Sequence, residues 1–323
     1  MSIASAEWER AESAIRAART ILITTHCNPD GDGIGSQLAL FHALTAIGKE
    51  VHLHNRDGLP RIYRFLPGSE AIAGGAHFPH CDLTIALDAG SRDRLGVDVD
   101  LLPSRPLLNI DHHISNSRYG SINLVDADYC STGLVVHALL QRLHLPLTAA
   151  IASAIYTTLV TDTGNFRHGR IDADLFRTAA ELVEAGAEPR AITAAIYENS
   201  ATERLRLFAL ALTTLSIENG GRSSWMHVDA AMYAASGADV EETEGFIDYA
   251  RAIHGVDITV FLRPDGPNGW RASFRSRNGI NVERLASEFG GGGHRHAAGC
   301  SLSGTLTEVR TRLQTRISQL MEQ

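Results

Sequence analysis

The amino-acid sequence predicts an α/β protein built from two domains. Its 323 residues suffice for two domains of the usual size, roughly 150 residues each. Hydrophobic residues make up 44% of the chain and charged residues 20%, which allows packed cores and argues against disorder. Short apolar runs alternate with helical patterns, and several runs end in a cluster of polar side chains. This alternation is typical of a mostly parallel sheet flanked by helices.

Residues 1–199 are expected to form the first and larger domain. The Ala-rich segment 1–19, with Glu and Arg interspersed, predicts an amphipathic helix. Further helices are predicted at 33–48, 130–143, 148–160, 172–186 and 189–199. β-branched and apolar runs predict strands at 20–26, 51–55, 81–90 and 106–110, with an edge strand at 119–125.

A helical linker is predicted at 200–221, where a Leu-rich pattern ends at Asn219-Gly-Gly221. Residues 222–323 are then expected to form a smaller α/β domain. A strand is predicted at 223–228, and strands 257–262 and 270–276 are expected to pair through a Pro- and Gly-rich turn. Helices are predicted at 282–289 and 306–321, with a glycine-rich segment at 290–294 between them.

The charge and composition exclude several classes of protein. A net charge of −8 argues against a protein that coats long DNA or RNA, although a few basic side chains can still hold a short phosphorylated ligand. The four cysteines show no CxxC spacing, so neither a zinc knuckle nor a disulfide framework is expected. The N-terminus lacks the apolar core of a signal peptide, and no apolar run approaches the roughly 18 residues of a membrane span. A cytoplasmic protein without a membrane partner is expected.

The predicted strand at 106–110 runs into the sequence Ile110-Asp-His-His113. Ligands of open parallel sheets bind at this end of the strands. Adjacent side chains on extended backbone point to opposite faces, so His112 and His113 are expected to have different roles, one toward a metal and one toward a substrate. The alternative is a capped strand end with solvated imidazoles.

A second polar cluster, His26-Cys-Asn-Pro-Asp-Gly-Asp32, follows the first predicted strand. Asn28 precedes a proline and is expected to be extended. Gly31 and Gly33 are expected to let the loop bend tightly, so that the side chains at positions 26, 30 and 32 converge. The alternative is an Asp-rich turn that only caps the following helix.

Asp88 and His112 end two further predicted strands, and Asp162 follows an apolar helix. Convergence of these clusters would bring four carboxylates and two imidazoles together. Such ligands suit Mn²⁺ or Mg²⁺ better than structural zinc, and the carboxylates would repel one another without cations. Two divalent ions about 3.5–4 Å apart can bind one hydroxide between them and hold both the attacking and the leaving oxygen of a phosphoryl transfer.

These segments resemble the four motifs of the DHH phosphoesterase superfamily, and the glycine-rich segment resembles the associated DHHA1 domain. Within the superfamily the chain is most similar to the bacterial nanoRNase type, an oligoribonuclease and pAp phosphatase. The resemblance covers nearly the whole chain, in the expected order. It is carried by the motifs His26-Cys-Asn-Pro-Asp-Gly-Asp32, Asp88-Ala-Gly90, Asp111-His-His113, Thr161-Asp-Thr-Gly164, Ser273-Phe-Arg-Ser276 and Gly290-Gly-Gly-Gly-His294.

The resemblance implies two divalent metal ions, with Mn²⁺ expected and Mg²⁺ or Co²⁺ as alternatives. Asp88 would bridge them, and Asp88 and His113 would act in catalysis, His113 as a donor or acid toward the phosphate. Asp111 would orient a histidine from outside the ligand groups. Asn116 would help to place the substrate. The first ion would be held by His26, Asp30 and Asp88, and the second by Asp32, Asp88, His112 and Asp162.

In the second domain, the glycine-rich segment is expected to bind substrate. Backbone N–H groups of Gly291, Gly292 and Gly293 can approach an anion without a clash from Cβ atoms, and His294 adds a further donor. Arg275 could grip a terminal phosphate with two hydrogen bonds. The alternative for the glycines is a flexible hinge.

The expected activity is metal-dependent hydrolysis of short RNA or DNA oligonucleotides to mononucleotides, and of pAp to AMP. A hydroxide held by the two metal ions would attack the phosphate in a cleft between the domains. One alternative is a phosphodiesterase for linear dinucleotides such as pApA, and another is a nucleotide sensor without catalysis. The sequence sets neither the polarity of attack nor the oligomeric state, and a homodimer stays open.

Overall fold

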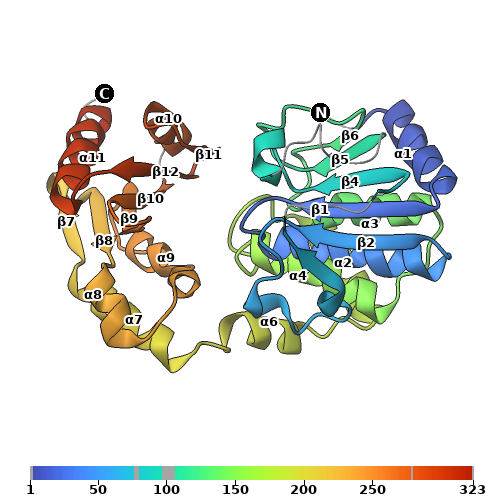
Figure 1. Ribbon diagram of the computed structural model, residues 1–323, viewed down its shortest axis with the longest axis horizontal. Coiled ribbons are helices and arrows are strands. Elements are labelled where there is room, and N and C mark those ends of the chain that lie inside the picture. Colours follow the sequence, from blue (N-terminus) through green and yellow to red (C-terminus); the bar gives the residue numbers. More distant parts are fainter. Residues whose placement is uncertain (1–2, 76–79, 97–105, 278, 322–323) are drawn as a thin grey trace. The chain divides into compact units, whose positions relative to one another are not determined.

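The computed structural model describes residues 3–75, 80–96, 106–277 and 279–321. The chain divides into two compact units, Met1–Asn199 and Ser200–Gln323 (Figure 1). Each unit is built around its own six-stranded sheet, which confirms the predicted two-domain α/β class.

All strand pairs of the first sheet are parallel, as predicted. The order across the sheet is β3-β2-β1-β4-β5-β6, so the predicted edge strand, β6, does lie at an edge. The three-residue strand at the opposite edge, β3, is too short to give a sequence pattern and was not predicted. The strands are β1 (Thr20–Thr25), β2 (Glu50–Asn55), β3 (Ile72–Gly74), β4 (Leu83–Leu87), β5 (Leu107–Asp111) and β6 (Ile122–Val125).

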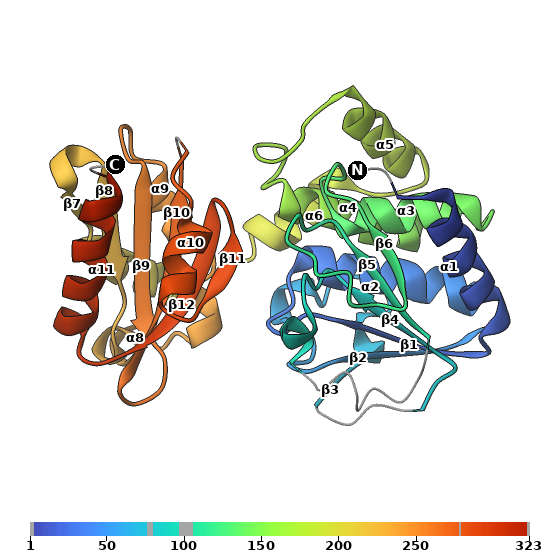
Figure 2. The same cartoon turned by 90° about the horizontal axis from the view of Figure 1, so that it is seen from above.

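Helices cover one face of this sheet in successive layers, with α2 and α3 on the strands and α4 and α5 beyond them (Figure 2). The helices are α1 (Ser5–Ala17), α2 (Gly31–Ala46), α3 (Thr132–Arg142), α4 (Ala149–Asp162), α5 (Ala173–Glu184) and α6 (Pro189–Tyr197). Short 3₁₀ turns are η1 (Arg61–Tyr63), η2 (Ser69–Ala71) and η3 (Arg92–Leu95).

The two faces of the first sheet bury different sets of side chains. Ile21 and Ile23 of β1 join the large core beneath the helices, whereas Leu22 joins a smaller cluster with Ala86 and Leu95 on the other face. This division follows from the two-residue period of a strand. Because both faces are covered, the central strands are apolar throughout rather than alternating.

The glycines near the start of α2 serve helix packing, not the loop bend that was expected. Gly31, Gly33 and Gly35 all lie within α2. A Cβ at Gly35 would be 2.5 Å from the carbonyl oxygen of Ala154 in α4, and one at Gly33 would be 2.4 Å from Thr25 Oγ1. The absence of these Cβ atoms lets α2 pack directly against β1 and α4.

The bend before α2 occurs instead at Asn28, whose φ of 52° is left-handed. The extended conformation expected for this pre-proline residue is therefore wrong. The backbone N–H of Asn28 donates a hydrogen bond to Asp57 Oδ2 (2.7 Å), a contact between distant parts of the chain that overrides the local preference.

The second unit has a mostly antiparallel sheet of order β11-β12-β10-β9-β8-β7, in which only the described pair β8 and β9 is parallel. The predicted pairing of two strands through a turn is confirmed by β9 and β10. The strands are β7 (Ser216–Glu218), β8 (Ser223–His227), β9 (Ile258–Pro264), β10 (Gly269–Ser276), β11 (Gly292–His294) and β12 (Ala297–Ser303).

Helices cover both faces of the second sheet (Figure 1). Within the predicted helical linker 200–221, the helix ends at Thr213, and the strand β7 follows at Ser216–Glu218. Leu207 and Ala211 of this helix are buried in the core of the second unit, so the segment 200–221 packs as part of that unit. The helices are α7 (Thr202–Thr213), α8 (Ala230–Ser236), α9 (Phe246–Arg251), α10 (Val282–Glu288) and α11 (Leu306–Met321), with 3₁₀ turns η5 (Asn219–Gly221) and η6 (Val240–Thr243).

We expect Gly35→Ala to destabilise the first unit by about 3 kcal/mol, because the added Cβ overlaps a backbone oxygen that cannot move alone. Gly48→Ala is the control. Its φ of 81° is left-handed but its surroundings are open, so it should cost only about 1 kcal/mol. Guanidinium denaturation measures the free energy of unfolding of both variants. An equal decrease in the two would refute the packing role of Gly35.

Candidate metal centre

The carboxyl ends of three neighbouring strands bring the polar clusters of the first unit together. His26 follows β1, Asp88 follows β4, and His112 follows β5. Strands β1 and β4 are adjacent, and the strand order reverses direction between them. In open parallel sheets this switch point is the usual place for a ligand.

Two helix ends complete the cluster. Asp30 caps α2, with its Oδ1 accepting hydrogen bonds from the N–H groups of Asp32 (3.0 Å) and Gly33 (3.2 Å). Asp32 lies in the first turn of α2, and Asp162 is the last residue of α4. The predicted capping role of the Asp-rich turn and its place in the cluster are therefore compatible.

The side chains form two groups that share Asp88. His26 Nε2 lies 3.7 Å from Asp30 Oδ1 and 3.4 Å from Asp88 Oδ2. His112 Nε2 lies 3.5 Å from Asp32 Oδ2, 3.4 Å from Asp162 Oδ2 and 3.9 Å from Asp88 Oδ1. The two carboxylate oxygens of Asp88 thus face different groups.

Backbone carbonyls orient both of these imidazoles. His26 Nδ1 is 2.8 Å from the carbonyl oxygen of Cys27, and His112 Nδ1 is 3.2 Å from that of Tyr129. A carbonyl only accepts, so Nδ1 carries the proton in each ring. Nε2 of each ring is thereby directed toward the carboxylates, where it could bind a metal ion.

His113 is held differently. Its Nδ1 lies 2.7 Å from Asp111 Oδ1, and the buried Asp111 also accepts from the backbone N–H groups of His112 (2.8 Å) and His113 (3.2 Å). The expectation that His112 and His113 point to opposite faces is wrong, since their ring centroids are 5.0 Å apart. Strand β5 ends at Asp111, so the alternation of an extended strand no longer applies.

Asn116, predicted to place the substrate, is engaged by the protein itself. Its Nδ2 donates to Asp111 Oδ2 (2.5 Å) and to the carbonyl of Ala89 (3.3 Å). Its Oδ1 accepts from Asn109 Nδ2 (3.0 Å) and from the N–H of Arg118 (2.6 Å). These contacts favour a role in holding Asp111 over direct contact with a substrate.

The start of α3 supports the carboxylates, a feature that sequence reasoning missed. The N–H groups of Thr132 and Gly133 donate to the two oxygens of Asp32 (2.7 and 3.0 Å), and Thr132 Oγ1 donates to Asp88 Oδ1 (3.1 Å). The sequence signal was Ser131, a typical N-cap before an apolar helical run. That signal locates the helix start but not the acids that it contacts.

The electrostatics of the cluster favour bound cations. When no cation is bound, burial and the charges of Asp88 and Asp162 raise the pKa of Asp32. Partial desolvation and the charge of Asp88 likewise raise the pKa of Asp162, whose side chain is 30% exposed. Burial lowers the pKa of His26, but its contacts with Asp30 and Asp88 outweigh burial and raise it overall. Asp32 and Asp162 therefore hold protons more tightly than usual unless a cation binds.

The donor set fits divalent metal ions. Within the groups His26–Asp30–Asp88 and Asp32–His112–Asp162, the possible ligand atoms all lie within 4.8 Å of one another. Carboxylate oxygens and imidazole nitrogens are ligands that Mn²⁺ accepts readily. A third group, Asp88–His112–His113, also meets the distance criterion, but it uses a His113 whose Nδ1 is already bonded to Asp111.

The predicted glycine-rich site of the second unit is partly strand. Gly292 and His294 begin and end β11, which pairs with β12. The N–H groups of Gly290 and Gly291 donate to carbonyls of α10. Contrary to the expectation, the N–H of Gly291 is therefore not available to an anion. A Cβ at Gly291 would be 2.2 Å from the carbonyl oxygen of Gly299, whereas Gly292 faces open space.

Arg275 and His294 occupy one row of this sheet. In β12, Ala297 pairs with Arg275 on one side and with His294 on the other. Their backbones are therefore two strand spacings apart, roughly 10 Å. Arg275 is half-buried, with Nη1 donating to the carbonyl of Phe274 (3.1 Å). The side chain of His294 lies outside the described part of the structure.

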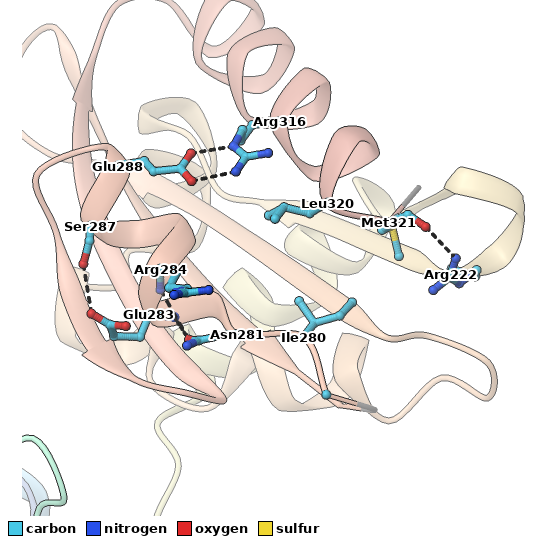
Figure 3. A pocket seen from close by; sticks show the side chains of 11 residues that line it. Arg222, Ile280, Asn281, Glu283, Arg284, Ser287, Glu288, Arg316, Leu320 and Met321 are labelled. Carbon is cyan, nitrogen blue, oxygen red and sulfur yellow. Dashed lines mark hydrogen bonds and ion pairs between the residues drawn. The ribbon is translucent and has the colours of Figure 1, made fainter. Parts of the chain in front are cut away.

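An open pocket of about 860 Å³ lies elsewhere in the second unit, beside α10 and the end of α11 (Figure 3). Its polar groups largely pair with one another, as Arg316 does with Glu288 (2.7 Å) and Ser287 with Glu283 (3.0 Å). None of the described residues that line it belongs to the predicted site. We therefore assign it no part in the chemistry.

Comparison with known proteins agrees with the fold. Residues 20–159 match the DHH family, N-terminal domain, and residues 228–323 match the DHHA1 domain. These matches define the class: a two-domain α/β phosphoesterase. The chain belongs to the DHH family, which confirms the resemblance seen in its motifs.

Named relatives cover most of the chain. The bifunctional oligoribonuclease and PAP phosphatase NrnA of Thermus thermophilus is 36% identical, over 88% of this chain and 84% of the relative. The Bacillus subtilis protein of the same name is 26% identical, over 88% and 89%. The crystal structure of an exopolyphosphatase-related protein from Bacteroides fragilis has a TM-score of 0.91 at 27% identity, with 99% of each chain covered.

Across the described ranges, no helix combines the length and apolar character needed to cross a membrane.

We expect Mn²⁺ to raise the melting temperature of the first unit, and to do so more strongly as the pH rises from 5 to 8. The raised pKa values of Asp32, Asp162 and His26 favour their protonated forms in the fold, so the stability that they contribute falls as the pH rises through those values. Bound cations replace the lost protons. Calorimetry with chelator or with Mn²⁺ measures the difference at each pH.

Asp88→Asn provides the control, because it removes the carboxylate that both groups share and should nearly abolish the Mn²⁺ effect. A thermal shift that stays constant or shrinks with increasing pH would argue against metal binding at this cluster.

Proposed function

We propose that this protein is a metal-dependent phosphoesterase that hydrolyses short oligonucleotides to mononucleotides and pAp to AMP. The observation that carries the proposal is the pair of acid–imidazole groups sharing Asp88 at the carboxyl ends of β1, β4 and β5. The names of the relatives in Thermus thermophilus and Bacillus subtilis support the substrate class.

In this proposal, two divalent ions, with Mn²⁺ as the first choice, supply an activated water and offset the charge of the phosphate. His26, Asp30 and Asp88 would hold one ion, and Asp32, Asp88, His112 and Asp162 would hold the other. Asp30 has a side chain that is 55% exposed, and Asp162 is also partly exposed, so substrate approaches from their side of the cluster.

His113 acts as the proton donor. Burial lowers its pKa, but the hydrogen bond with Asp111 and the charges of Asp88 and Asp111 raise it above the ordinary value. Because Nδ1 is bonded to Asp111, the proposal assigns the contact with substrate to Nε2. A protonated His113 can donate to a phosphate oxygen or to the leaving group. Asn116 keeps Asp111 in place for this task.

For the second unit we propose recognition of the nucleotide part of a substrate. Arg275 presents a guanidinium that suits a phosphate, and the open backbone at Gly292 permits close approach. The net charge of −8 disfavours long polyanions, which leaves short oligonucleotides and mononucleotides with an extra phosphate as the better substrates.

We expect Mn²⁺-dependent release of mononucleotides from RNAs of two to five nucleotides and of phosphate from pAp, with much slower hydrolysis of 20-nucleotide RNA. Chromatography of the products over this panel, with pApA as a further substrate, provides the measurement. A marked preference for pApA over every other substrate would replace the proposal with the dinucleotide phosphodiesterase. The absence of turnover on all of them would leave a nucleotide sensor.

We expect His113→Asn to lower kcat at least about 100-fold, the usual contribution of a general acid, with little change in Mn²⁺ binding. Asparagine keeps a hydrogen-bond donor, but its amide cannot act as an acid in the pH range of an enzyme assay. His112→Asn is the matched control, since it should lose metal affinity as well as activity. If His113→Asn lost an equivalent of Mn²⁺, His113 would be a ligand rather than the acid.

A further inference from the structure

Thr132 is the one described residue that donates hydrogen bonds to carboxylates of both ligand groups. Its hydroxyl donates to Asp88 Oδ1 (3.1 Å), and its backbone N–H donates to Asp32 Oδ2 (2.7 Å). The side chain is fully buried, so water does not compete for these bonds.

We propose that the Thr132 hydroxyl is a positioning group that holds the Asp88 carboxylate in the orientation needed to bridge two metal ions. The inference rests on the metal-dependent function proposed above. Thr132 contacts no ion and no substrate in this role; it acts through Asp88.

Asp88 needs such support for two reasons. Its φ of 55° is left-handed, an uncommon conformation for a residue with a side chain. The terminal torsion of an aspartate is also soft, so the carboxylate rotates easily unless hydrogen bonds hold it. Oδ2 faces His26 (3.4 Å), while Oδ1 accepts from Thr132 and faces His113 Nδ1 (3.4 Å) and His112 Nε2 (3.9 Å). Rotation would withdraw Oδ1 from the second group.

Thr132 is itself rigidly placed. Ser131 Oγ accepts from the N–H of Leu134 (3.3 Å) and lies 3.0 Å from Thr158 Oγ1 of α4. A Cβ at Gly133 would be 2.1 Å from the same Thr158 oxygen, so α3 begins in direct contact with α4. These contacts hold the backbone of Thr132 in place, so its hydroxyl stays within hydrogen-bonding distance of Asp88.

The alternative is that the hydroxyl merely satisfies a buried carboxylate and stabilises the fold. Thr132→Val separates the two roles, because valine keeps the shape of the side chain and the backbone N–H to Asp32 but removes the hydroxyl. Thr132→Ser retains the hydroxyl and tests rescue.

The matched control is Thr157→Val. Thr157 is equally buried, and its hydroxyl donates to the carbonyl of Ser153 (2.9 Å) within α4. We expect Thr157→Val to lower the free energy of unfolding as much as Thr132→Val does, without changing Mn²⁺ binding.

The measurement is Mn²⁺ binding to the full-length chain by titration calorimetry, with electron paramagnetic resonance to detect the spin-coupled pair. We expect Thr132→Val to bind the first ion with little change and the second about 10- to 100-fold more weakly, as for other partners of metal ligands. The coupled signal should disappear at Mn²⁺ concentrations that saturate the wild type, and Thr132→Ser should restore it. The kcat should fall with the second ion while KM changes little.

Tight binding of two coupled ions by Thr132→Val would overturn the inference. An equal loss of Mn²⁺ affinity in Thr157→Val would overturn it as well. Should Thr132→Val fail to fold, Thr132→Ala carries the same comparison. A wild-type chain that binds only one ion would remove the bridge and the inference with it. Because metal binding is the readout, a wild type that binds both ions but hydrolyses nothing would refute the proposed function alone.

Discussion

Repulsion among carboxylates that are crowded at one edge of a sheet is the constraint on which the first unit depends. Asp32 and Asp88 are buried, and Asp30 and Asp162 lie beside them. An apolar core contains no groups that offset the charge of such a cluster. Backbone N–H groups around the cluster therefore offset part of it. The N–H groups at the starts of α2 and α3 point at the acids, and the remaining charge calls for cations.

The packing of the helices follows from this constraint. The starts of α2 and α3 can both approach the acid cluster only if α2, α3 and α4 pack closely together. Gly35 of α2 and Gly133 of α3 permit this, because each would place a Cβ within 2.5 Å of α4. Glycine in a helix interior costs roughly 0.5–1 kcal/mol relative to alanine. Here that cost accompanies the placement of the acid–imidazole cluster, so helix packing and the candidate site depend on neighbouring residues of the same helices.

The histidines of the site differ by what their Nδ1 atoms contact. Two of them contact carbonyl oxygens through Nδ1, which directs Nε2 toward the carboxylates as a possible metal ligand. His113 bonds to a carboxylate, which favours a charged ring and hence a donor. In the proposed function, histidine would serve both metal binding and acid catalysis, and the partner of its Nδ1 atom would decide between the two roles. In the second unit, by contrast, the register of the sheet sets the positions of Arg275 and of strand β11. Their placement does not depend on buried acids.

The sequence by itself determined the α/β class, the central strands and the identity of the residues at their carboxyl ends, because apolar period and chain order are local properties. Only the tertiary structure decided that Asn28 is left-handed, that Gly31 and Gly33 serve packing, and that His112 and His113 face one cluster. It also decided that Thr132 reaches Asp88, 44 residues away in the chain. Each of these features depends on a contact between distant segments, and no pattern within a single segment encodes the atoms that it will meet.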